Sequence, residues 1–358
     1  MNDNNRKKYK IPILISIALV LLAVILEIAA RSINGFATWY SQHIYVLWVN
    51  TLGRISGQVS CSVVELLLYI VIIILVADLI RQIIKRELQL LRAMGCRVLV
   101  LAAVLFFLYS ANCGVNYYRS TFEEESGITA REYTVEELGE VCMYLTDQVN
   151  EYADKVPRDD SGIMTIDQGE TKTYAITAMK NLGIKYPCLE GYYSQPKGLL
   201  VSEILSYQGL TGIYVPFTIE ANYNSDMMDY NIPFTMCHEL SHLRGFMKEK
   251  ESNFIGYLAC VESEEATLRY SGNLLAWIYC TNQLRTMEGN NWEEVRTELC
   301  DSAKADLAAN NEFWDSYEGP VEEMQDSLND QYLKANGQKD GVRSYDLMVE
   351  LVVAYLEQ

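Results

Sequence analysis

The chain has 358 residues, of which half are hydrophobic and 21% are charged, so a disordered or low-complexity protein is excluded and about two folded units are expected. The charges are uneven: residues 1–117 hold 11 Lys and Arg against 5 Asp and Glu, whereas residues 118–358 hold 18 against 42. A domain that acidic repels phosphate backbones, which excludes nucleic-acid binding as a default function.

Three apolar stretches dominate the first third of the chain, at about residues 11–30, 63–80 and 95–113. At about 1.5 Å per residue, a helix of about 20 residues spans the roughly 30 Å core of a bilayer. A cleaved signal peptide would have a shorter apolar region, of about 7–15 residues. We therefore predict that residues 1–117 form a membrane domain with three transmembrane helices, and that residues 118–358 form a separate domain.

The flanking cations predict the orientation of these helices, because short loops rich in Lys and Arg stay on the cytoplasmic side. Residues 6–10 carry four cations and residues 81–97 carry five, whereas residues 31–58 carry two. This pattern places the N-terminus inside and residues 118–358 outside the cytoplasmic membrane. Four aromatic residues in the outer loop fit either an interfacial belt or ordinary loop packing: Trp39, Tyr40, Tyr45 and Trp48.

The first element predicted in the second domain is a helix at residues 134–156, which begins with a Thr-Val-Glu-Glu capping box. Residues 198–224 favour strands, most clearly 212–221, and helical patterns dominate from residue 233. The fold class expected is α+β, mostly helical with a small sheet. Six cysteines in this domain are expected to be buried free thiols rather than disulfides, since no C-x-x-C pair occurs: Cys142, Cys188, Cys237, Cys260, Cys280 and Cys300.

The clearest chemical motif is His-Glu-Leu-Ser-His at residues 238–242, in a chain with three histidines in all. Two imidazoles four residues apart lie on one face of a helix and can bind one zinc ion. Glu239 would then act as the general base for a water molecule on the metal. The alternative is a hydrogen-bonded pair, His238 and His242, on a packed helix without metal.

A third ligand must come from beyond the motif. The pattern with a third histidine fails, because this chain has Lys248 at that position. Gly245 would end the first helix, and a second helix would bring a carboxylate to the metal. Glu249 is favoured over Glu251, because Asn253 lies one turn after Glu249 and can support a ligating imidazole.

The residues that carry a resemblance are 214–222, 233–246 and 344–355. With them the chain resembles the bacterial membrane-anchored family known as domain of unknown function 3810. The His-Glu-x-x-His motif followed by Glu-x-x-x-Asn also resembles the gluzincin metallopeptidases, in which the first Glu of that spaced pair is the third zinc ligand. The resemblance implies a zincin-like catalytic fold, but no known substrate.

Two further features concern the substrate. In zincin-like folds an edge strand holds the substrate in an extended form, and residues 212–221 lie in the right order for it; an interior strand without substrate contact is the alternative. Arg269 and Tyr270 are the nearest downstream donors for an oxyanion, although a structural role suits both better.

We therefore expect a zinc metallopeptidase in a bacterial cytoplasmic membrane that hydrolyses peptide bonds in a protein or peptide. Zn²⁺ would be bound by His238, His242 and Glu249, with Glu239 as the base and Asn253 in support. A bacterial source suits the short basic N-terminus and the lack of an organellar signal. Two alternatives remain: a zinc-binding membrane sensor or assembly factor that cuts nothing, and a hydrolase of cell-wall amides.

Overall fold

The computed structural model describes residues 3–85, 88–345 and 347–357. Arg86, one of the five cations in residues 81–97, and Asp346, in the segment 344–355 that carries the family resemblance, lie outside the described residues. The chain divides into two compact units. Unit 1 comprises Met1–Arg119 and Val215–Glu220, and unit 2 comprises Ser120–Tyr214 and Ala221–Gln358.

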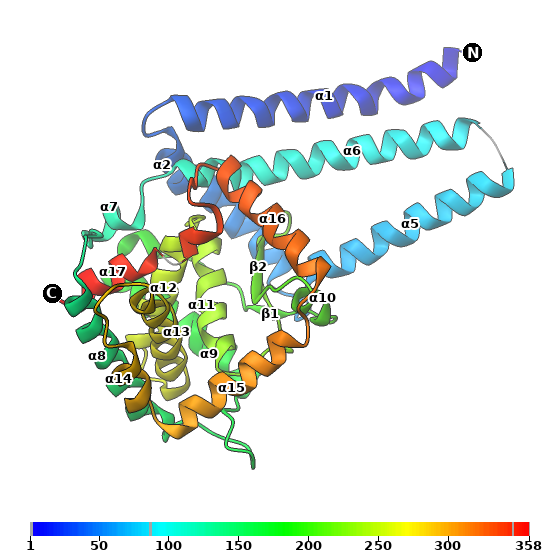
Figure 1. The fold of residues 1–358 in the computed structure, drawn as a ribbon. Coiled ribbons are helices and arrows are strands. Elements are labelled where there is room, and N and C mark those ends of the chain that lie inside the picture. The colour runs from blue at the N-terminus through cyan, green and yellow to red at the C-terminus, as the bar shows by residue number, and fades with distance from the viewer. Residues whose placement is uncertain (1–2, 86–87, 346, 358) are drawn as a thin grey trace. The chain divides into compact units, whose positions relative to one another are not determined.

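Unit 1 is built on three long helices, α1 (Asp3–Ser32), α5 (Val63–Lys85) and α6 (Leu88–Asn112), with α6 packed along α1 and against α5 (Figure 1). Three helical segments are long and apolar enough to cross a membrane: Tyr9–Ser32, Val63–Lys85 and Leu90–Tyr118. The three predicted apolar helices are thus confirmed. The third is longer than the expected 95–113, because helical residues continue at both of its ends.

The segment between α1 and α5 is helical rather than a loop. It consists of α2 (Phe36–Tyr40), η1 (Ser41–Tyr45), α3 (Val46–Trp48), η2 (Val49–Gly53) and α4 (Arg54–Ser56). Tyr40 and Tyr45 are buried within unit 1, whereas Trp39 is half exposed. Burial of two aromatic side chains shows that packing accounts for part of the aromatic cluster.

A six-residue excursion, Val215–Glu220, belongs to unit 1 although it lies far along the chain. The buried Glu220 carboxylate accepts hydrogen bonds from the backbone N–H groups of Val63 and Val64, at 3.1 and 3.0 Å. A carboxylate is favoured there because the N-terminus of α5 carries unsatisfied donors and a partial positive charge. Asn112 also donates to the carbonyl of Pro216, at 2.9 Å. Two of the three long apolar helices, α5 and α6, therefore hold this excursion.

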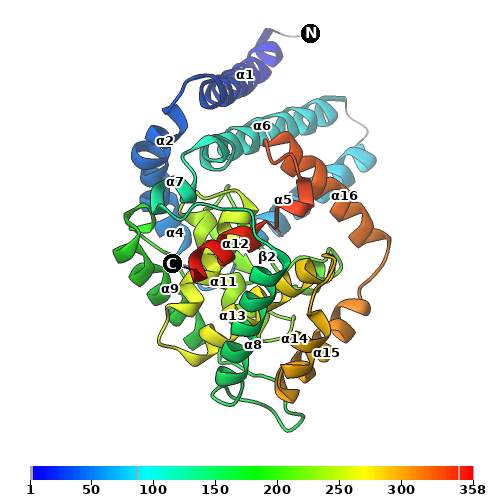
Figure 2. The same ribbon diagram turned by 60° about the vertical axis from the view of Figure 1, so that its left-hand side comes forward.

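Unit 2 is a helical assembly around one buried helix. Its principal helices are α8 (Val135–Ala153), α9 (Gln168–Lys185), α11 (Asn231–Leu243), α12 (Glu249–Val261), α13 (Ala266–Arg285) and α17 (Met348–Leu356). The predicted capping box at Thr134 is confirmed, and α8 ends three residues before the expected 156. All 13 residues of α11 are buried, since α9, α12 and α13 pack around it (Figures 1 and 2). The residues 238–242 thus lie inside the unit.

The sheet has three short strands, β1 (Lys197–Gly198), β2 (Gly212–Val215) and β3 (Glu220–Tyr223), in the order β1-β3-β2. β1 runs parallel to β3, with Lys197 opposite Asn222. The prediction of one strand over 212–221 is wrong, because a turn separates β2 from β3. Pro216 has no N–H for a ladder, and Ile219 adopts a left-handed φ of 55°. Part of the predicted strand region is the short helix α10 (Glu203–Ser206).

In unit 1, η3 (Gly114–Tyr118) follows α6. The remaining elements of unit 2 are α7 (Phe122–Ser126), η4 (Pro187–Leu189), α14 (Trp292–Glu298), α15 (Asp301–Asp315), α16 (Pro320–Ala335) and η5 (Gly341–Tyr345). The cysteines of both units are free thiols in the structure. Asp306 of α15 is fully buried and joins three parts of the unit. Its carboxylate accepts hydrogen bonds from Arg158 at 3.0 Å, from the Tyr270 hydroxyl at 2.5 Å and from the Met164 N–H at 2.8 Å.

Replacing Asp306 by Ala should destabilise unit 2 strongly, because it leaves these buried donors without their acceptor. Loss of one partner of a buried ion pair costs about 3 kcal/mol or more, which corresponds to a fall in Tm of about 6–12 °C. Thermal unfolding of the full chain in detergent, followed by circular dichroism, measures the change. Asp315→Ala, at an exposed position of the same helix, is the control. An equal Tm for both variants would contradict this role of Asp306.

Candidate metal centre

A tight reversal after α11 brings α12 back against it. Arg244 is the C-cap of α11 and Gly245 has a φ of 87°. The Gly245 N–H donates to the carbonyl of His242 at 2.8 Å, and the Phe246 N–H donates to the carbonyl of Ser241 at 3.3 Å. These two bonds form a Schellman motif, which needs a left-handed residue and so favours glycine. The expectation that Gly245 ends the first helix is confirmed.

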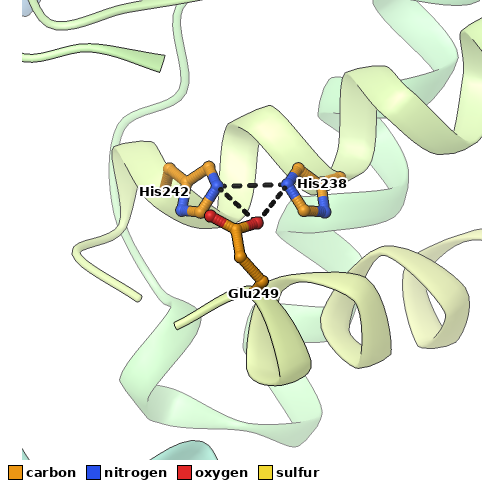
Figure 3. A group of neighbouring side chains, drawn as sticks. All are labelled: His238, His242 and Glu249. Atoms are coloured by element: carbon orange, nitrogen blue, oxygen red, sulfur yellow. Dashed lines mark hydrogen bonds and ion pairs between the residues drawn. The ribbon is translucent and has the colours of Figure 1, made fainter. Parts of the chain in front are cut away.

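The reversal places Glu249, the first residue of α12, opposite the two imidazoles of α11 (Figure 3). Nε2 of His238 lies 3.1 Å from Nε2 of His242 and 3.3 Å from Oε2 of Glu249. Nε2 of His242 lies 3.7 Å from the same oxygen. Ligands at about 2.0–2.1 Å from a tetrahedral zinc ion lie about 3.3 Å from one another. These three side chains could therefore hold a metal ion without rearrangement.

Glu251, the alternative ligand, makes other contacts. Its carboxylate accepts a hydrogen bond from the Phe122 N–H at 2.8 Å and lies 3.4 Å from the Lys248 ammonium. It therefore caps the start of α7. Of the two acids considered as the third ligand, the structure places Glu249 beside the imidazoles.

Glu249 and His242 each change the pKa of the other. Burial raises the pKa of Glu249, but the His242 charge and hydrogen bonds from both imidazoles outweigh it and lower that pKa to about 2. Burial lowers the pKa of His242, but the Glu249 carboxylate outweighs it and raises that pKa to about 9. Without a metal, the group is therefore a carboxylate facing an imidazolium. A bound cation would take the place of this proton.

Glu239 lies beside this group and has an acceptor atom to spare. Burial raises the pKa of its carboxyl group to about 7, partly offset by the two imidazoles. Its Oε2 is buried and accepts no hydrogen bond from the described residues. The edge strand β2 passes close to its other oxygen, since a Cβ on Gly212 would lie 2.5 Å from Oε1. A side chain at residue 212 would displace either the strand or the carboxylate.

The orientation of His242 is held by the turn that follows it. Its Nδ1–H donates to the carbonyl of Phe246 at 2.7 Å, because a carbonyl can only accept. The Ser252 hydroxyl lies 3.1 Å from the same nitrogen and donates to the same carbonyl at 3.0 Å. Protonation at Nδ1 leaves the lone pair of Nε2 for a metal.

The sequence analysis did not identify Ser252 as a residue that orients His242. Ser252 directly precedes Asn253, which was predicted to support an imidazole. Asn253 is buried on α12, and its predicted role beside an imidazole stays a prediction. Nδ1 of His238 is buried and has no hydrogen-bond partner among the described residues. Hydrogen bonds therefore orient the His242 imidazole, whereas Nδ1 of His238 makes none with the described residues.

The two candidate oxyanion donors lie elsewhere. Arg269 donates to the carbonyl of Ser263 and, at 2.6 Å, to the Tyr152 hydroxyl. Tyr270 donates to Asp306, as described above. Both therefore have structural roles. A nearer polar group that the sequence did not indicate is Gln338, whose Oε1 accepts a hydrogen bond from the Glu249 N–H at 3.2 Å.

Comparison with known protein families shows where the chain belongs. A family described as "Protein of unknown function (DUF3810)" matches residues 40–353. No curated protein and no solved structure matches the chain. The resemblance to that family is thus supported, whereas the gluzincin resemblance rests on the motif alone.

Replacing Ser252 by Ala should weaken the binding of a divalent cation at this centre. The hydroxyl would no longer hold the Phe246 carbonyl and the His242 ring in place, and loss of such a supporting contact typically lowers metal affinity by about tenfold or more. Competition with a chromophoric chelator measures the affinity for zinc. Ser316→Ala, at an exposed position, serves as the control. Unchanged zinc affinity in Ser252→Ala would show that the carbonyl alone orients the ring.

Proposed function

We propose that this chain, which belongs to the DUF3810 family of proteins of unknown function, is a membrane-anchored zinc metallopeptidase. The observation that carries the proposal is the spacing of the three ligand atoms of His238, His242 and Glu249, which suits one tetrahedral ion. Two imidazole nitrogens and one carboxylate form a donor set that catalytic zinc uses, with a fourth position left open. Glu239 follows His238 directly in the chain, and one of its carboxylate oxygens is buried without a partner among the described residues.

The chemistry divides between the metal and the chain. A bound zinc ion would lower the pKa of a coordinated water to about 7 and polarise the scissile carbonyl. Glu239 would accept a proton on Oε2 and deliver it to the leaving amine. Its burial favours this exchange, because the pKa near 7 lets the same carboxyl group take and release a proton at neutral pH. Glu249 and the two imidazoles would hold the ion and contribute no proton.

A peptide is the substrate class that the surroundings of Glu239 favour. β2 is an edge strand of the described sheet, and it begins at Gly212 beside the Glu239 carboxylate. A strand at the edge of a sheet can pair with an extended peptide through main-chain hydrogen bonds. A peptide bound in this way would run past the base and the metal ligands.

The cation pattern supports an orientation for the anchor. We propose that the N-terminus lies in the cytoplasm and that unit 2 lies outside the cytoplasmic membrane of a bacterium. An odd number of crossings places the two ends of the membrane domain on opposite sides. The strongly acidic composition of residues 118–358 also disfavours docking on anionic lipid head groups.

Replacing Glu239 by Gln should abolish peptide hydrolysis and leave zinc binding intact, because the amide cannot accept the proton but does not alter the three ligands. The expected loss of kcat is about 10²–10⁴-fold. The assay uses the full chain in detergent with a casein-derived peptide mixture, and zinc content is measured in the same samples. Glu264→Gln, at an exposed position, is the control.

Removing the metal from the wild type with a chelator should stop hydrolysis, and adding zinc should restore it. Activity that survives in Glu239→Gln would show that another group is the base. A wild type that binds zinc but cuts no peptide would instead favour the non-proteolytic sensor or assembly factor. Cleavage of cell-wall fragments alone would identify the amide hydrolase.

The orientation has its own test with reporter fusions in a bacterium. Alkaline phosphatase is active only outside the cytoplasm. Green fluorescent protein fluoresces in the cytoplasm, but it does not fluoresce when it is exported in an unfolded state. We expect phosphatase activity from a fusion after the last residue and fluorescence from a fusion after Lys85, because the second helix returns the chain to the cytoplasm. The reverse pattern would contradict the proposed topology.

A further inference from the structure

Glu249, the proposed third metal ligand, lies at the N-terminal end of its helix, where the backbone N–H groups have no acceptor within the helix. Glu249 is the first residue of α12, and the preceding Lys248 makes no side-chain cap because its ammonium group has no acceptor. The N–H groups of Glu251 and Ser252 donate to the carbonyl of Lys248, both at 3.0 Å. The N–H of Glu249 has no such local acceptor, and helix ends fray when their first donors are unsatisfied.

Gln338 supplies the missing acceptor from 89 residues further along the chain. Its Oε1 accepts a hydrogen bond from the Glu249 N–H at 3.2 Å. A cap from another part of the chain ties the backbone of Glu249 to a fixed point outside its own helix. The carboxylate that faces the imidazoles is carried by that same backbone.

The fixed point is the end of α16. Gly337 has a φ of 88°, and its N–H donates to the carbonyl of Lys334 at 3.1 Å. The Gln338 N–H donates to the carbonyl of Leu333, which is fully buried, at 3.0 Å. These bonds form a second Schellman motif. The backbone that carries the Gln338 side chain is therefore held by a hydrogen-bonded helix end.

Gln338 is itself enclosed. It is 8% exposed, and its Nε2 is buried without a hydrogen-bond partner among the described residues. Burying an amide donor without a partner costs about 1–3 kcal/mol, so the side chain is not placed there for stability alone. The contact that this placement achieves is the one to Glu249.

From these contacts we infer that Gln338 is the positioning residue for the third metal ligand. It acts through Glu249, by holding the first residue of α12 where its carboxylate meets both imidazoles. The inference rests on the proposed metal site and goes beyond it, because it assigns a role to a residue outside the motif and outside α11 and α12. Removing a residue that orients a ligand typically lowers metal affinity by about 10–100-fold.

The test compares zinc affinity in full-length variants in detergent, by competition with a chromophoric chelator. Gln338→Met keeps the length of the side chain and removes the acceptor, whereas Gln338→Glu keeps an acceptor for the Glu249 N–H. Gln331→Met, at an exposed position of α16, is the matched control. Absorption spectra with Co²⁺ in place of zinc report the coordination geometry, which a general loss of stability would not alter.

We expect Gln338→Met to bind zinc at least about tenfold more weakly and to change the Co²⁺ spectrum, while Gln338→Glu and Gln331→Met remain close to the wild type. Wild-type affinity in Gln338→Met would overturn the inference. Equal losses in Gln338→Met and Gln338→Glu would overturn it as well, because the acceptor would then not be the cause. A wild type that binds zinc no better than Glu249→Gln would instead overturn the metal site itself.

Discussion

The reversal of the chain at Gly245 is the constraint on which the candidate centre depends. Imidazoles four residues apart can come together on any helix, but a third ligand has to arrive from another direction. The left-handed Gly245 turns the chain within a few residues, so that α12 starts against the face of α11 that carries the histidines. The carbonyl of Phe246, exposed by the same turn, then orients His242. One backbone conformation therefore provides both the approach of Glu249 and the support of an imidazole.

Helix ends supply most of the polar contacts around this group. The end of α11 presents the Phe246 carbonyl, and the start of α12 presents Glu249. The end of α16 presents Gln338. Groups that a helix cannot satisfy internally are available at its ends for other bonds, and here they face the candidate centre. Helices can therefore pack around α11 on all sides, while the side chains of His238, His242 and Glu249 still contact one another.

Much of this arrangement could be predicted from local spacing. The motif at 238–242, the stop at Gly245 and the choice of Glu249 all depend on residues within one or two helical turns, where periodicity determines which side chains meet. The three apolar helices follow from composition and length. Gln338 could not be predicted in this way, because nothing near it in the sequence refers to a residue 89 positions away. Ser252 was within reach of the same periodicity, but Asn253 had the more familiar spacing.

The single predicted strand over 212–221 failed for a different reason. Its apolar and β-branched residues do suit a buried extended segment, and Ile219 is fully buried. What the pattern cannot show is that the burial of Ile219 occurs in unit 1, in a left-handed conformation that β-branched residues rarely adopt. Hydrophobicity indicates that a side chain is buried, but not which part of the molecule buries it.

The Val215–Glu220 excursion bears on how this protein can be divided for study. A fragment trimmed to the residues after Arg119 would retain residues 238–242 and Glu249. It would, however, remove Gly53, on which Ile219 packs, and the two backbone amides that Glu220 binds. An isoleucine exposed in this way would favour aggregation. Truncations that begin after residue 119 are therefore poor substitutes for the full chain.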